Sequence, residues 1–170
     1  MKLLPLSFAA AALLAAVTAG AEKLQSPVPL PILAWYGPPA DHTNNGRFKE
    51  LADAGFNYSF SNFPDAASME RALNIAKGAG LKLIVALPDL HNDPEGTVKR
   101  FMDHPAVGGW YLRDEPNRKD FKDLADWVKR IRAVDDAHHC YINLFPNYAT
   151  AEQLGSPTYA DHVREFVSTV

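Results

Sequence analysis

Two adjacent carboxylates, Asp114 and Glu115, follow an apolar segment of the chain and directly precede Pro116. Neighbouring carboxylates repel each other, and at least one of them must lose part of its solvation. Because Pro116 ends a strand and turns the chain, both side chains can face the same cleft. A carboxyl group held in this way can have a raised pKa and act as a general acid. The alternative is a polar loop, in which Asp114 caps the next helix and Glu115 is solvated.

Other segments that end apolar runs carry side chains suited to sugars. Trp35 and Tyr36 close the first run, Asp89 and His91 follow the third, and Asn143 lies near the end of the fifth. Aromatic faces stack on sugar rings, whereas amide and carboxylate groups hydrogen-bond to hydroxyls. We therefore expect these residues to bind a saccharide, with core packing as the alternative for each aromatic residue.

Asp89, His91, Asp114 and Glu115 also allow an oxygen-rich metal site with one imidazole. The chain has no His-x-His or His-Glu-x-x-His pattern to support this alternative, and neither a metal ion nor a cofactor is predicted. No Gly-x-Ser-x-Gly marks a Ser-His-Asp triad. The one cysteine, Cys140, is interpreted as a small buried hydrophobic residue.

The composition of the 170 residues is 47% hydrophobic and 22% charged, which is ordinary for a globular protein. It excludes disordered, collagen-like and disulfide-rich classes. The net charge of −3 offers no basic surface for phosphate backbones, so no nucleic-acid partner is expected.

The N-terminus has the pattern of a secretory signal peptide. Lys2 precedes an apolar run over residues 3–17, and small residues follow at 18–21. The run is shorter than the ~20 apolar residues of a membrane span. We predict cleavage after Ala21, a secreted or periplasmic protein, and no stable membrane insertion after cleavage; the alternative is an uncleaved anchor. Residues 22–31 are predicted to be an extended lead-in, because they contain three prolines.

Strand-like and helix-like segments alternate five times over residues 32–170. Apolar runs predict strands at 32–36, 56–60, 81–87, 107–112 and 140–145. Helical spacing predicts helices at 44–54, 65–79, 93–103, 119–134 and 158–170, and residues 88–92 are expected to form a loop.

This alternation predicts an α/β fold made of about five βα units with parallel strands. Two architectures accept the pattern, a partial (β/α)8 TIM barrel or an open doubly wound sheet. No Gly-x-Gly-x-x-Gly follows the first strand, which weakens the nucleotide-binding form of the open sheet.

Residues 108–117, Gly-Gly-Trp-Tyr-Leu-Arg-Asp-Glu-Pro-Asn, resemble the fourth-strand motif of retaining glycoside hydrolases with the (β/α)8 fold. In that clan the acid/base glutamate ends strand four, usually within Asn-Glu-Pro. Residues 34–39 and 140–146 also look like strand ends of secreted bacterial, β-galactosidase-like members. The resemblance covers most of residues 32–170, and it implies the N-terminal part of a TIM-barrel glycoside hydrolase domain.

The resemblance implies that Glu115 is the general acid/base and that the substrate is an oligosaccharide or polysaccharide. Asp114 stands where the family usually has an asparagine that hydrogen-bonds the sugar 2-hydroxyl. The family's nucleophile is a second glutamate at the end of strand seven, ~5–5.5 Å from the first. Because five strands are predicted here, we expect a fragment that lacks the nucleophile and is inactive alone.

Two other functions stay open. One is a secreted, non-catalytic carbohydrate-binding module, and the other is a metal-dependent hydrolase on an open sheet. A half-barrel would also leave its first and fifth strands as open edges. Self-association through these edges, or marginal stability, is therefore predicted.

Overall fold

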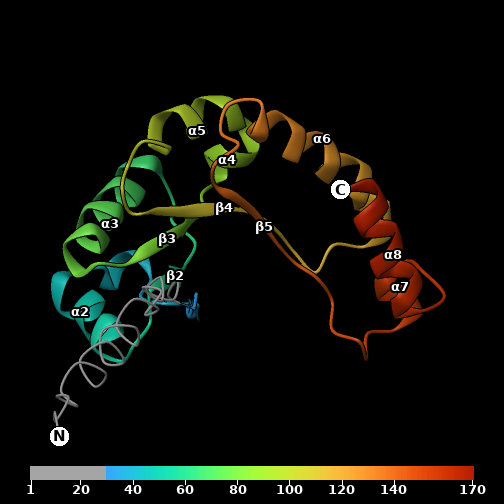
Figure 1. Cartoon of the computed structure of the whole chain (residues 1–170), viewed down its shortest axis with the longest axis horizontal. Helices are drawn as coiled ribbons and strands as arrows, with labels where there is room; N and C mark the ends of the chain where they lie inside the picture. Colours follow the sequence, from blue (N-terminus) through green and yellow to red (C-terminus); the bar gives the residue numbers. More distant parts are fainter. Residues whose placement is uncertain (1–29) are drawn as a thin grey trace, which may run out of the picture. The chain divides into compact units, whose positions relative to one another are not determined.

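The sheet of the protein consists of five parallel strands. They are β1 (Leu33–Trp35), β2 (Tyr58–Phe60), β3 (Lys82–Val85), β4 (Val107–Asp114) and β5 (His139–Asn143). Their spatial order is the same as their order in the chain. The sheet curls into half a barrel, and the helices follow its outer side (Figure 1).

The strand order explains why a barrel segment forms. Right-handed crossovers between strands in chain order place every connecting helix on the same face of the sheet. A doubly wound sheet instead reverses its strand order at a switch point, which puts helices on both faces. The predicted α/β class with parallel strands is confirmed, and the curled sheet is that of a partial barrel.

The computed structural model describes residues 30–170, of which Pro31–Val170 form one compact unit. The predicted signal peptide and all but the last two residues of the predicted lead-in lie outside the described residues. Within residues 30–170, no helix combines the length and apolar character needed to cross a membrane.

The main helices are α2, α3, α5, α6 and α8, and they match the five predicted helices. Their bounds are Asn45–Asp53, Ala66–Ala79, Pro94–Phe101, Phe121–Arg132 and Tyr159–Thr169. The shorter elements are the 3-10 helices η1 (Ala40–His42) and η2 (Arg118–Asp120) and the α-helices α4 (Pro88–Asn92) and α7 (Ala151–Leu154).

The prediction of a loop at residues 88–92 was wrong, because this segment is helix α4. Pro88 occupies the first turn, where the missing N–H is not needed, and Leu90 is buried. Helix α7 was not predicted either. It starts at a capping box formed by Thr150 and Gln153, a local signal that is present in the sequence.

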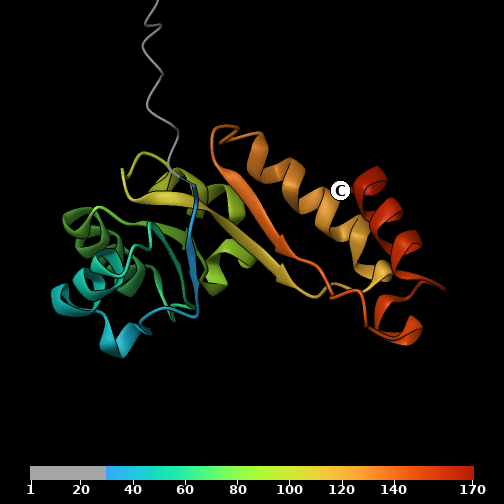
Figure 2. The same cartoon turned by 60° about the horizontal axis from the view of Figure 1, so that its bottom comes forward.

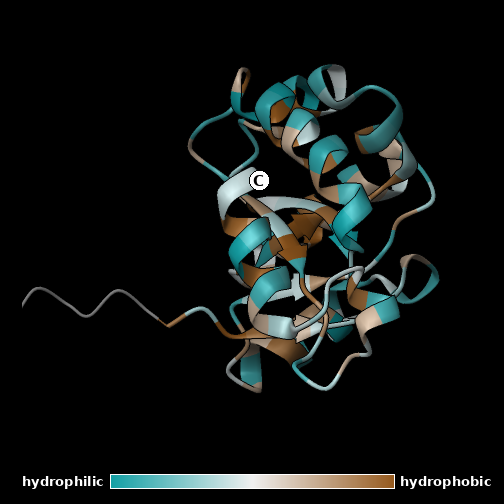
Figure 3. Ribbon diagram, turned by 90° about the vertical axis from the view of Figure 1, so that its right-hand side faces the viewer, coloured by the Kyte–Doolittle hydropathy of each residue, from teal (hydrophilic) through white to brown (hydrophobic). Residues whose placement is uncertain are grey.

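The strands contain many hydrophobic residues (Figure 3), and their buried apolar side chains belong to two separate clusters. The larger cluster lies between the strands and the outer helices. It includes Phe48 of α2, Leu73 of α3, Trp110 of β4 and Phe121 of α6. The smaller cluster lies on the concave side. Its members come from strands and the residues directly after them, namely Leu33, Tyr58, Phe60, Ile84, Ala86, Tyr111 and Tyr141.

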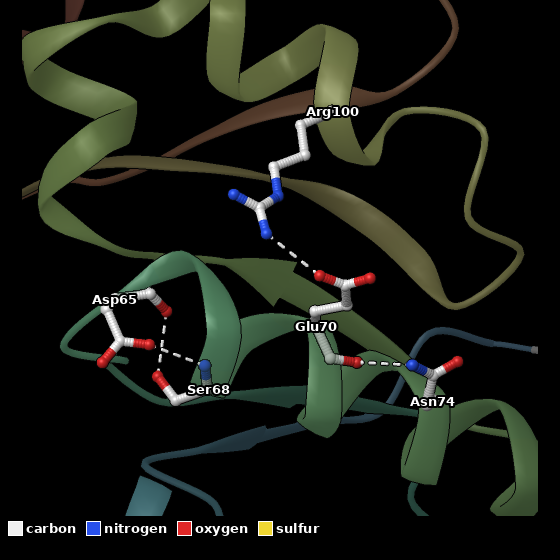
Figure 4. Close-up of polar contacts among 5 residues, drawn as sticks. All are labelled: Asp65, Ser68, Glu70, Asn74 and Arg100. Carbon is white, nitrogen blue, oxygen red and sulfur yellow. Dashed lines mark hydrogen bonds and ion pairs between the residues drawn. The ribbon is translucent and has the colours of Figure 1, made fainter.

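Helix α3 is held at its start and along its outer side by short polar contacts (Figure 4). The Asp65 carboxylate accepts a hydrogen bond from the Ser68 N–H at 2.7 Å, and the Ser68 hydroxyl donates to the Asp65 carbonyl at 2.9 Å. One turn later, Arg100 of α5 donates to the Glu70 carboxylate at 3.0 Å. These contacts set the start of α3 and connect it to α5.

The Asp65 cap makes a prediction about acid sensitivity. The backbone hydrogen bond from Ser68 is the main reason that the pKa of Asp65 lies below its ordinary value. A lowered folded-state pKa stabilises the fold above the unfolded-state pKa of ~3.9, and this contribution is lost as the pH falls through the folded-state value. We expect Asp65→Ala to lower the urea midpoint at pH 7, and the difference from wild type to shrink toward about pH 2.

The matched variant is Asp65→Asn, whose amide oxygen can still cap the helix. It should lie between wild type and Asp65→Ala at pH 7. A difference between wild type and Asp65→Ala that is equally large at both pH values would contradict the ionised cap.

Candidate active site at the carboxyl edge of the sheet

Glu115 follows the last residue of β4 in a strained backbone conformation. Its φ is 44°, and Tyr36, which follows the last residue of β1, has a φ of 55°. These are the two non-glycine residues with positive φ among residues 30–170. Such conformations cost free energy in L-residues and often occur at functional sites. Both residues were singled out from the sequence as site candidates.

The backbone of Glu115 is tied to the neighbouring strand, because its N–H donates to the Asn143 carbonyl at 2.7 Å. Asp114 is the register partner of Asn143, and the Asn143 amide donates to the Asp114 Oδ1 at 2.7 Å. The structure therefore brings three of the predicted site residues together at the ends of β4 and β5.

A bulge in β4 decides which way Asp114 faces. The register pairs Tyr111 with Tyr141, Arg113 with Ile142 and Asp114 with Asn143, which leaves Leu112 as an extra residue. Since side chains alternate along the regular strand β5, the bulge places Tyr111 and Asp114 on the concave face. Arg113 is left on the opposite face, toward the helices.

The loop after Glu115 is braced by α7 and α8. The Asn117 amide donates to the carbonyls of Glu152 (3.1 Å) and Gln153 (2.8 Å), and Arg118 pairs with Glu165 at 2.6 Å. Asn117 also caps η2, so the expectation that Asp114 caps the next helix was wrong, whereas Glu115 is exposed, as that alternative expected. These contacts hold the backbone on the C-terminal side of Glu115.

The Glu115 side chain is exposed and forms no hydrogen bond or ion pair with the rest of the described chain, residues 30–170. The exposed Asp114 carboxylate, by contrast, already accepts from Asn143. The two adjacent carboxylates therefore have different environments. Glu115 is available to a ligand or to a proton transfer, whereas Asp114 belongs to a polar pair.

Aromatic rings cover the concave face of the sheet, on the strands that lead to Asp114 and Glu115 and on their neighbours. Trp35 contacts Phe60 with ring centroids 4.6 Å apart, Tyr111 at 6.0 Å and Tyr141 at 5.9 Å. The last contact joins β1 to β5, the two edge strands, across the curl of the sheet. Figure 2 shows β5 running beside β4, its partner in the sheet.

Two rings of this aromatic layer, those of Trp35 and Tyr36, are packed against a neighbour and partly exposed to solvent. The relative exposure of Trp35 is 37% and that of Tyr36 is 63%, although both rings also contact Phe60. Sequence reasoning placed Tyr111 only in a strand, because the bulge that places it beside Asp114 has no sequence signal. Burial raises the pKa of the Tyr111 hydroxyl, and the negative charge of Asp114 adds to this effect.

Asp89 and His91 lie on helix α4, apart from the acidic pair. Two residues along a helix point in different directions, and the two side chains line different cavities. His91 packs edge-on against Trp127 of α6, with ring centroids 5.0 Å apart. Neither Asp89 nor His91 contacts Asp114 or Glu115 within the described part of the chain.

Within residues 30–170, no three His, Cys, Asp or Glu side chains are grouped so that they could hold a metal ion. His138, the residue before β5, instead donates to the Asp135 carboxylate at 2.8 Å. Cys140 is half-buried rather than fully buried, and burial raises the pKa of its thiol.

The fold and the site together define an α/β chain with a curled parallel sheet and an exposed glutamate at the end of its fourth strand. No protein-family model matches the chain, and no curated protein or solved structure matches it significantly.

Proposed function

We propose that the carboxyl edge of this sheet is the acid/base side of a retaining glycoside hydrolase site, with Glu115 as the general acid/base. The observation that carries the proposal is the Glu115 carboxylate, exposed and unpaired among the described residues, at the end of β4 on a strained backbone. A general acid must lie within hydrogen-bond reach of the glycosidic oxygen, and no contact within residues 30–170 holds the Glu115 carboxylate away from a ligand.

The residues around Glu115 suit a saccharide. The Asp114–Asn143 pair offers carboxylate and amide atoms for sugar hydroxyls. The partly exposed rings of Trp35 and Tyr36 offer apolar faces at the end of β1. In the proposed reaction, Glu115 gives its proton to the leaving oxygen while the bond from that oxygen to the anomeric carbon breaks.

Retention requires a second carboxylate ~5–5.5 Å from the first, on the other side of the sugar. Within residues 30–170, the contacts at this edge bring only one other carboxylate close to Glu115, that of the adjacent Asp114. A nucleophile added to the solution can take the place of the second carboxylate, so that the acid role of Glu115 can be tested by itself. Azide would attack the anomeric carbon, the glycosidic bond would break, and the Glu115 proton would pass to the leaving oxygen.

We expect the protein, in the presence of sodium azide, to convert disaccharides or alkyl glycosides of its preferred sugar into glycosyl azides, detected by mass spectrometry. These leaving groups need a proton, so Glu115→Gln should lower the rate at least ~100-fold. Glu152→Gln is the matched control, because it removes an exposed carboxylate from α7. Equal rates for wild type and Glu115→Gln would rule out the acid/base role.

The second candidate is a non-catalytic carbohydrate-binding module, which the exposed ring of Tyr36 favours. Glycan binding that is retained in Glu115→Gln but lost in Tyr36→Gly, with no glycosyl azide formed by the wild type, would support this function instead. Glycine suits the positive φ at position 36, so the variant removes the ring without adding backbone strain.

A further inference from the structure

Two cavities meet beside the end of β4, on the side that faces α4 and α6. The larger has a volume of about 410 Å³ and the smaller about 260 Å³. His91, Arg113 and Trp127 line both. The larger cavity lies across the carboxyl ends of β2, β3 and β4, which is the edge that carries Glu115. Its volume is in the range of small-molecule sites, ~300–1,000 Å³.

The guanidinium of Arg113 is the cation of this cavity and has no close partner. Its one ion pair within the described residues is with Asp120 at 3.8 Å, and it makes no hydrogen bond there. The Asp120 Oδ2 already accepts the Asn117 N–H at 2.9 Å. By contrast, Arg130 is held by two hydrogen bonds to Glu95. The donors of Arg113 are therefore available to a ligand.

The charges of the two cavities differ. Arg113 and His91 line the larger cavity, and no carboxylate lines it. In the wall of the smaller cavity three aspartates, Asp120, Asp123 and Asp126, outnumber the two arginines, Arg113 and Arg130. An anionic group is therefore favoured in the larger cavity and opposed in the smaller one. The planar guanidinium fork also matches a carboxylate, which it can bind with two parallel hydrogen bonds.

The remaining wall of the larger cavity suits a ring. Phe63, Leu87, Pro88 and Trp127 supply apolar surface, and the Asn62 amide supplies a polar group. Many ligand sites have this composition, in which apolar walls surround a few polar groups that set orientation. A sugar that carries a carboxylate combines both requirements.

We propose that this cavity binds an acidic sugar unit, a uronic acid, whose carboxylate is held by Arg113. The assignment rests on the proposed function, since it names the substrate class of the same strand edge. Arg113 is two residues before Glu115, and the bulge turns it toward α4 and α6, whereas Asp114 faces the concave side. The acidic unit would therefore lie beside the sugar whose linkage Glu115 protonates.

The test is a binding titration of the whole 170-residue protein, monitored by NMR. The probes are oligogalacturonates and oligomannuronates, each compared with its carboxyl-reduced counterpart, in which the carboxylate is a hydroxymethyl group. The indole N–H of Trp127 reports locally, because this residue lines the cavity and donates to the Leu90 carbonyl at 3.1 Å. The indole of Trp110 is the internal reference, since it is fully buried and bonded to Asp135.

We expect at least one uronate series to shift the Trp127 signal and to bind ~10-fold or more tightly than its reduced counterpart, as a hydrogen-bonded charge pair should. Arg113→Gln should remove that difference, and Arg113→Lys should keep part of it. Arg47→Gln is the matched control, because it removes an exposed guanidinium on α2. It should bind as wild type does.

Equal affinity for the acidic and reduced probes, or unchanged binding by Arg113→Gln, would overturn the assignment. So would the absence of any shift with every uronate. If 6-sulfated or 6-phosphorylated sugars bound more tightly than the uronates, the group that Arg113 binds would be another anion and not a carboxylate. Glu115→Gln separates the two proposals, because it should bind uronates normally while losing the azide reaction.

Discussion

Replacement of Asp135 by alanine is expected to destabilise the folded protein by about 3–5 kcal/mol. The relative exposure of Asp135 is 6%, and its Oδ2 accepts from the Trp110 indole at 2.9 Å and from His138 at 2.8 Å. Its Oδ1 accepts the N–H groups of Ala137 and His138. Alanine would leave the fully buried Trp110 indole, a member of the larger core cluster, without this partner.

Urea unfolding followed by far-UV circular dichroism would measure this loss. Asp136→Ala is the matched control, since Asp136 is the exposed neighbour, and a surface change of this kind is usually within ~0.5 kcal/mol of wild type. If Asp135→Ala and Asp136→Ala were equally stable, the hydrogen bonds of Asp135 would not stabilise the fold as proposed.

The same carboxylate adds a pH dependence. Burial raises the pKa of Asp135, but hydrogen bonds from His138 and Trp110 outweigh this effect and leave the pKa below its ordinary value. The stabilisation is therefore present above the unfolded-state pKa of ~3.9 and is lost as the pH falls through the folded-state value. The difference between wild type and Asp135→Ala should narrow in acid.

Gly109→Ala is expected to destabilise the protein by about 1–3 kcal/mol. A Cβ at this position would lie 2.7 Å from the His139 carbonyl oxygen and 3.3 Å from the Ile84 Cδ1. Gly109 is the register partner of His139 in the β4–β5 ladder, so the clash is with backbone that cannot rotate away. Relief would separate the strands whose far ends hold Asp114 and Asn143.

Gly78→Ala is the matched control. Gly78 lies in α3, and nothing is within 4 Å of a Cβ built there. Alanine is favoured over glycine by up to roughly 1 kcal/mol within a helix, and Gly78 lies in the last turn of α3, so this variant should be at least as stable as wild type. If Gly109→Ala were as stable as wild type or more stable, β4 and β5 would have accommodated the added Cβ without loss of stability.

Local patterns were enough to predict the elements and their order. The apolar run at 81–87 predicted a strand, and the helical spacing at 119–134 predicted a helix; β3 and α6 confirm both. The predicted strand at 107–112 was too short, because β4 continues to Asp114, and Glu115 then follows it directly. Export, the acid/base role and the saccharide partner stay predictions.

The sequence by itself determined five βα units and a carboxylate pair after the fourth strand, because hydrophobic periodicity and turn residues act over a few neighbouring positions. Only the tertiary structure decided the facing of Arg113 and Asp114, since the bulge at Leu112 depends on the register with β5. Only it separated Asp89 and His91 from the Asp114–Glu115 pair and brought Trp35 to Tyr141. Register and curl result from contacts between distant segments, and no local pattern contains them.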